Sequence, residues 1–192
     1  MRQKDPRKIA ALQTAVIQVL ITEGYQNLSV AKIAKLAGIS PATLYIYYQD
    51  KQDMLSQVYL QIKDHIDTQL FAAHDEQATV AAQFRLLLTN YAHALRLYPK
   101  EAAAMRIFNQ TPELVAPAAY AQSMARAKPI ARLYQQGIAT KALRNLAPEL
   151  LIAFTFQPLD QLAENHFRAA TPFTDAEIAM AIDMAWAACA QH

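Results

Sequence analysis

The stretch that most constrains this fold runs from Ser29 to Leu55, because it contains start and stop signals for two short helices. Ser29 can accept hydrogen bonds from the free N–H groups at a helix start. Apolar side chains then recur at intervals of three and four residues, as on the buried face of a helix: Val30, Ile33, Ala34 and Ala37. Gly38 follows where a left-handed residue ends a helix, and Ser40-Pro41 begins the next one. The pattern predicts a helix-turn-helix, the unit that places its second helix in the DNA major groove.

Further residues of this stretch stand in a fixed order and spacing: Ser29, Ile33-Ala34, Ala37-Gly38-Ile39-Ser40, Thr43-Leu44-Tyr45, Tyr47-Tyr48, Lys51 and Leu55. This order resembles the DNA-binding domain of the tetracycline-repressor (TetR) family of bacterial regulators, whose pattern is T-x-x-x-I-A-x-x-A-G-V-S-x-x-T-L-Y-x-[HY]-F-x-x-K-x-x-L. The departures are Ser29 for Thr, Ile39 for Val and Tyr48 for Phe. With the preceding helix included, the resemblance covers roughly 50 residues of the chain.

The resemblance implies DNA contacts by the second helix and its surroundings. Thr43 is expected near the groove, and Tyr45, Tyr47 and Lys51 on phosphates, with a purely structural role for the two tyrosines as the alternative. The helix contains no Arg, Lys, Asn or Gln, so its side chains suit thymine methyl groups better than guanine. The expected DNA-contacting residues are Ser29, Ser40, Pro41, Ala42, Thr43, Tyr45, Tyr47 and Lys51.

Charge is distributed unevenly along the chain. The first 56 residues carry seven basic and four acidic side chains, whereas the remaining residues carry eleven and twelve. A basic front and a nearly neutral rear fit a DNA-binding head on a body that binds something else. The basic N-terminal side chains are expected to be ordinary solvated charges, with a minor-groove arm as the alternative: Arg2, Lys4, Arg7 and Lys8.

Composition favours an all-α fold in the cytoplasm. Hydrophobic residues make up 54% of 192 residues and glycine occurs only three times, which suits helices better than sheets or disorder. The single cysteine, Cys189, excludes a disulfide framework within the chain and fits a reducing compartment. The apolar run near the N-terminus is interrupted by polar residues, and no stretch approaches 18 uninterrupted apolar residues. No membrane span or signal peptide is expected.

Helix signals continue to the end of the chain. Asp5-Pro6 predicts a first helix that ends near Gly24, and Asp50 a fourth helix that links head to body. We expect a DNA-binding domain over residues 1–56 and an effector-binding and dimerisation domain over 57–192. In the body, helices are expected over residues 80–98, 101–108 and 148–169, with a kink at Pro158 in the last of these. A further helical segment before residue 136 is expected to be kinked by Pro129 and to end at Gly137. The capping box Thr174-Asp175-Ala176-Glu177 is expected to open the last helix.

The family resemblance also implies a small-molecule cavity among the helices of the body. Kinked helices leave gaps, and aromatic and methionine side chains lining such gaps make apolar pockets with a few polar groups. The expected lining is Phe84, Tyr91, Met105, Phe108, Tyr120, Met124, Phe154 and Gln157, with Asn90, His93, Arg106 and Asn109 as further polar candidates. Each of these residues alone is more often plain core or surface. We expect a largely apolar or aromatic effector of modest size.

Catalytic and metal motifs are missing from the sequence. The five histidines are scattered without a metal-binding spacing, and no glycine-rich phosphate loop is present. We therefore expect no catalytic residues, metal or cofactor. The predicted function is a homodimeric transcriptional repressor that binds a double-stranded DNA operator and is released by an unidentified small hydrophobic effector. The alternatives are a helical carrier or enzyme module whose helix-turn-helix is only structural, and an activator; operator, regulated genes and effector stay open.

Overall fold

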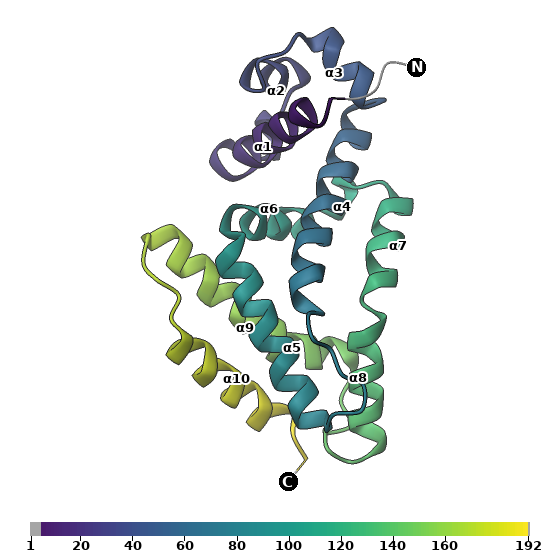
Figure 1. The fold of residues 1–192 in the computed structure, drawn as a ribbon, viewed down its shortest axis with the longest axis vertical. Coiled ribbons are helices and arrows are strands. Elements are labelled where there is room, and N and C mark those ends of the chain that lie inside the picture. The colour runs from purple at the N-terminus through teal and green to yellow at the C-terminus, as the bar shows by residue number, and fades with distance from the viewer. Residues whose placement is uncertain (1–4, 192) are drawn as a thin grey trace. The chain divides into compact units, whose positions relative to one another are not determined.

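The computed structural model describes residues 5–191, and these fold almost entirely into helices (Figure 1). The expected all-α fold is therefore confirmed. The only β-type pairing among the described residues is an isolated bridge between Leu143 and Ala190. The helices are α1 (Pro6–Glu23), η1 (Tyr25–Asn27), α2 (Val30–Leu36), α3 (Pro41–Tyr47), α4 (Lys51–Leu70), α5 (Val80–Leu97), α6 (Pro99–Gln110), η2 (Pro112–Leu114), α7 (Pro117–Arg126), α8 (Lys128–Ala139), α9 (Pro148–Ala169) and α10 (Asp175–Cys189).

The chain forms two compact units, which are described separately. The first unit comprises the residues up to Lys63 together with Lys100–Ser123, and the second comprises Asp64–Pro99 and the residues from Met124 onward. Helix α4 runs without interruption through the point where the first unit ends. The expected boundary between residues 56 and 57 also falls inside α4, and the functional division at that point stays a prediction.

In the first unit, α1 and α2 pack together and α3 packs against α2 (Figure 1). Helix α1 begins and ends at the expected signals. The Asp5 carboxylate accepts from the Arg7 N–H at 2.9 Å, and Gly24 adopts a φ of 80° after the last turn. The apolar stripe of the three helices is fully buried: Leu12, Val16, Leu20, Ile33, Ala34 and Leu44. Two short helices could not bury this much apolar surface without α1.

The rest of the first unit is built around the N-terminal part of α4. Asp50 caps this helix as expected, because its carboxylate accepts from the Asp53 N–H at 2.8 Å. Further along, the Tyr59 hydroxyl and the Ser123 hydroxyl are 2.8 Å apart. The Tyr59 ring also meets Phe108 edge-on and stacks on Tyr120. These contacts hold α6 and α7 to α4.

The second unit is a helical layer in which α5 packs against α8, α9 and α10 (Figure 1). On α5, Phe84, Leu87, Leu88 and Leu95 are buried. Phe84 meets Trp186 of α10 edge-on at a centroid distance of 5.1 Å. The Tyr91 hydroxyl donates to Asp160 of α9 at 2.5 Å. The capping box at the start of α10 is confirmed, since Thr174 and Glu177 bond reciprocally.

Two expectations for the segment before α9 are wrong. Pro129 does not kink one long helix; the segment is divided at Ala127 into α7 and α8, and Pro129 lies in the first turn of α8. Proline is tolerated there because the first N–H groups of a helix have no partner to lose. Pro158, in contrast, lies inside α9, which continues on both sides of it.

Gly137 does not end a helix either. It lies inside α8, which continues to Ala139, and the left-handed residue after the helix is Lys141 with a φ of 59°. A Cβ atom on Gly137 would lie 2.5 Å from the end of the Leu143 side chain. Glycine at this position therefore allows the Leu143 side chain to pack closely against α8. A glycine needed for packing and one needed for a turn look the same in a sequence.

Candidate nucleic-acid interface

The turn between α2 and α3 is fixed by its caps. The Ser29 hydroxyl accepts from the Lys32 N–H at 3.3 Å, and the Ser40 hydroxyl accepts from the Thr43 N–H at 3.1 Å. Gly38 adopts a φ of 68°, and the Ile39 N–H donates to the Ala34 carbonyl at 3.0 Å. This bond satisfies a carbonyl that the end of α2 leaves free. The helix-turn-helix expected from the sequence is present.

The inner face of α3 holds it against the rest of the head. Leu44 and Tyr48 are buried, and Tyr47 is only 7% exposed. The Asp5 N–H donates to the Tyr47 hydroxyl oxygen at 3.4 Å, so this tyrosine connects α3 to the start of α1. Tyr47 therefore has a structural contact beside the phosphate contact that the family resemblance implies for it, which stays a prediction.

The outer face of α3 is open. Pro41 and Ala42 are exposed, and Tyr45 and Ile46 are exposed by 56% and 55%. Thr43 is half-buried, and its hydroxyl lies 2.8 Å from that of Ser40. Both hydroxyls thus take part in the cap at the start of α3. Side chains of this face can contact a groove without disturbing the core.

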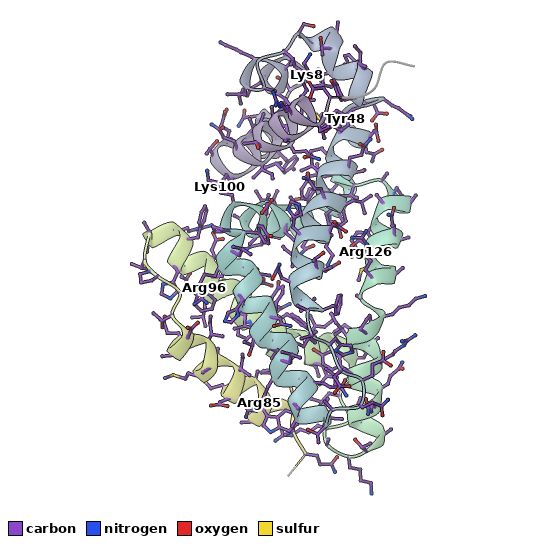
Figure 2. All side chains as sticks on the ribbon, in the orientation of Figure 1. Lys8, Tyr48, Arg85, Arg96, Lys100 and Arg126 are labelled. Atoms are coloured by element: carbon purple, nitrogen blue, oxygen red, sulfur yellow. The ribbon has the colours of Figure 1, made fainter. Side chains whose placement is uncertain are left out.

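The first unit carries exposed cationic side chains on α1, α2 and α4. Lys51 is exposed at the start of α4, and Lys35 is exposed near the end of α2. Lys32 forms an ion pair with Glu23 at 2.5 Å. Near the N-terminus, Arg7 and the Lys8 labelled in Figure 2 are exposed on α1. The candidates Arg2 and Lys4 for an N-terminal arm lie outside the described residues.

Tyr48 occupies the position where the family pattern has phenylalanine, and its hydroxyl is the unusual group of this head (Figure 2). The hydroxyl is buried and has no hydrogen-bond partner among the described residues. Burial, and to a lesser extent the Asp53 carboxylate, raises the pKa of Tyr48 to about 12. The ring is buried, and the hydroxyl that phenylalanine would lack is unsatisfied among the described residues.

Family comparisons cover both ends of the chain. The model for bacterial regulatory proteins of the tetR family matches residues 13–58, and the model for the tetracyclin repressor-like C-terminal domain matches residues 80–190. The second match alone covers more than half of the chain. This chain belongs to the TetR family. The TetR resemblance inferred from residues 29–55 is confirmed.

Relatives of this TetR-family chain include two curated proteins. It is 29% identical over 91 residues to a fatty acid metabolism regulator protein of Bacillus subtilis, a match that covers 47% of this chain and 46% of the relative. An uncharacterized HTH-type transcriptional regulator of Haemophilus influenzae is 24% identical over 112 residues, a match that covers 58% of this chain and 60% of the relative. The chain thus matches about half the length of these curated relatives. Both are described as regulators, not as enzymes.

Solved structures share the fold over nearly the whole chain. A TetR family regulator from Marinobacter aquaeolei VT8 is 28% identical with a TM-score of 0.88, and the match covers all of both chains. FadR of Bacillus subtilis, solved in complex with stearoyl-CoA, has a TM-score of 0.68 at 19% identity over 92% of this chain and 96% of that one. At that identity the likeness establishes the fold alone.

The residues expected around an effector fall in both units. Met105, Phe108 and Tyr120 belong to the first unit, and Phe108 and Tyr120 both contact Tyr59 there. The other five belong to the second unit. Phe84 is buried there and Tyr91 is half-buried, whereas three side chains are exposed: Met124, Phe154 and Gln157. The expected effector pocket stays a prediction.

A cavity of about 740 Å³ lies in the second unit at the corner between α9 and α10, near the end of α5. Arg96, labelled in Figure 2, lines it and donates to the Asp175 carboxylate at 2.6 Å. This hydrogen bond and the charge of Arg96 lower the pKa of Asp175 below its ordinary value of 3.8. The His166 ring lies 3.1 Å from the Glu177 carboxylate. The capping box could be predicted from the sequence but this cluster could not, because Arg96 lies 70 to 81 positions before its other members, His166, Asp175 and Glu177.

Between residues 5 and 191, no three histidine, cysteine or acidic side chains gather as metal ligands. In the same range, no helix is long and apolar enough to cross a membrane.

Proposed function

We propose that this TetR-family chain is a transcriptional repressor that binds a double-stranded DNA operator through α3. The observation that carries the proposal is the exposed outer face of α3 on a rigidly capped helix-turn-helix. A helix held by its inner face with an open outer face can enter the major groove without rearrangement. Lys51 and Tyr45 are proposed to bind phosphates on either side, and Ser29, Ser40, Pro41, Ala42, Thr43 and Tyr47 complete the proposed DNA-contacting surface.

The test is selection of duplexes from a random pool by the full-length chain at moderate salt. The proposal predicts enrichment of an inverted repeat, because a two-fold dimer presents two identical heads to one face of the DNA. Failure to enrich any sequence, together with no retardation of random duplex at low salt, would contradict it. That outcome would favour a carrier module with a structural helix-turn-helix.

A homodimer is proposed because α9 and α10 expose a large amount of apolar surface. Large exposed apolar side chains concentrated on two neighbouring helices are a feature of interaction sites. The exposed side chains are Leu150, Ile152, Phe154 and Phe167 on α9 and Met180 and Met184 on α10. A second copy of the same face is a suitable cover, since an isologous contact gives the two-fold symmetry that an inverted repeat requires.

The proposed effector is a largely apolar molecule with a long acyl chain as the first candidate class. Two observations on relatives support this class: one curated relative regulates fatty acid metabolism, and a structural neighbour was solved with stearoyl-CoA. By linkage, an effector that binds the DNA-free form more tightly must lower operator affinity by the same factor. In a dimer whose heads must match grooves about 34 Å apart, a small change in head spacing is enough for release.

Acyl-CoA thioesters of increasing chain length, with free CoA as the control, test this class. Long-chain thioesters are expected to raise the melting temperature of the protein and to release a labelled operator over the same concentration range. Release by free CoA alone, or stabilisation by thioesters without any release, would contradict the proposed effector class.

A further inference from the structure

The outer face of α3 is apolar to an unusual degree for a helix that enters a groove. Ala42, Tyr45 and Ile46 are spaced at three and four residues, so they form one continuous patch on α3. Ile46 is 55% exposed, whereas Leu44 two positions earlier is fully buried. Ile46 therefore contributes little to the core of the head, and its exposed branched side chain is available for contacts with DNA.

Groups that recognise purines are missing from the same helix. Guanine is bound by two donors of an arginine or lysine, and adenine by the amide of asparagine or glutamine. None of these residues occurs between Pro41 and Tyr47. The two hydroxyls at the start of α3, on Ser40 and Thr43, are bonded to each other within the cap. The patch thus offers apolar surface where many recognition helices offer hydrogen bonds.

One base presents a matching apolar group in the major groove. Thymine carries a 5-methyl group at the groove edge, and apolar side chains contact it. Burying one methyl group against an apolar side chain changes an equilibrium constant by about fourfold. In a dimer the contact occurs once in each half-site, so two such contacts give about a sixteenfold effect where positions act independently.

We infer that Ile46 recognises thymine 5-methyl groups in the major groove and is a specificity-determining residue of this regulator. The inference rests on the proposed DNA-binding function and adds the chemical group that is recognised. It predicts that each half-site of the operator contains a thymine whose methyl group contributes to the affinity of the protein for DNA, in addition to any contribution of its base-pairing atoms. Phosphate contacts by other residues supply the rest of the affinity without base preference.

Replacement of thymine by uracil tests the inference, because it removes only the methyl group and retains base pairing. Each thymine of the selected operator is replaced symmetrically in both half-sites, and the dissociation constant is measured by fluorescence anisotropy at fixed salt. Replacement at one position, or at two adjacent positions, is expected to raise the dissociation constant by about tenfold or more, because two methyl contacts are lost in the dimer. An operator with no thymine common to its half-sites, or no sensitivity at any position, would overturn the inference.

A variant cycle assigns the effect to the side chain. The Ile46→Ala variant should bind the thymine and uracil operators with nearly equal affinity, because the methyl group has lost its partner. The matched control Leu36→Ala truncates another exposed apolar side chain of the head, on α2, and should retain the full sensitivity to uracil. Undiminished sensitivity in Ile46→Ala would mean that another side chain contacts the methyl group or that uracil acts through DNA shape, and either would overturn the assignment to Ile46. Absence of binding to any duplex would instead contradict the proposed function itself.

Discussion

At the scale of single residues, Tyr48 combines a buried ring with a hydroxyl that is unsatisfied among the described residues. A buried hydroxyl without a partner costs about 1–3 kcal/mol of folding free energy. Its phenol has no bond to lose among the described residues, so the Tyr48→Phe variant should be more stable by about 1 kcal/mol. The free energy of unfolding in urea is the measurement.

The matched control for this prediction is Tyr59→Phe in the same unit. The Tyr59 hydroxyl is bonded to Ser123 at 2.8 Å, so its removal should lower stability by about 1 kcal/mol. Opposite signs for the two variants are expected. A loss of stability in Tyr48→Phe equal to that in the control would mean that the Tyr48 hydroxyl is satisfied in solution.

Gly137 is a second residue at which the environment decides the sign of a substitution. Alanine is favoured over glycine in a helix by about 1 kcal/mol, but a Cβ atom here would overlap the buried Leu143 side chain. Overpacking costs about 1–3 kcal/mol, so we expect Gly137→Ala to be destabilising. The double variant with Leu143→Ala should lose less stability than the two single losses added together. Strict additivity in thermal unfolding would contradict the packing explanation.

At the scale of elements, the first residues of α10 make its stability depend on pH. The pKa of Glu177 is lowered below its ordinary value of 4.5, first by hydrogen bonds from the Thr174 hydroxyl and N–H and then by His166. A carboxyl group with a lowered folded-state pKa stabilises the fold above its unfolded-state pKa. This contribution is lost as the pH falls through the folded-state value, below about pH 4.5.

The Glu177→Gln variant should therefore be less stable than the parent chain at neutral pH, and this difference should shrink on acidification below about pH 4.5. Thr174→Ala should reduce the same pH dependence because it removes the largest cause of the shift, whereas Thr174→Ser should retain it. Melting temperatures between pH 3 and pH 7 provide the measurement. A constant difference between Glu177→Gln and the parent across this range would contradict the explanation.

The elements also show which features of this chain are encoded locally. The helix starts at Ser29, Ser40, Asp50 and Thr174 were predictable, because each cap depends on residues within three positions. The packing role of Gly137 was not, since it depends on how the loop after α8 brings Leu143 back against the helix. For the same reason the outer face of α3 could be predicted from the sequence, while the cluster around Arg96 could not.

At the scale of the whole molecule, the proposed dimer makes a prediction for α10. Met180 and Met184 lie one helical turn apart and are 64% and 68% exposed. The Met180→Glu, Met184→Glu double variant places charges on the proposed interface and should be monomeric by light scattering, with a lower operator affinity. The control Met124→Glu makes the same change at an exposed methionine of α7 and should remain dimeric. A dimeric double variant, or a monomeric parent chain, would contradict the proposed interface.

The central claim is that this TetR-family chain binds DNA through the first unit, with phosphates held beside α3. The salt dependence of operator binding tests this claim most directly. Each ionic phosphate contact contributes about one unit to the slope of log affinity against log salt concentration. The parent chain should give a steep linear slope, and Lys51→Ala should reduce it by about two units in a dimer, one for each half-site. The control Lys128→Ala removes an exposed lysine of the second unit and should leave the slope unchanged. An unchanged affinity and slope in Lys51→Ala would contradict the account.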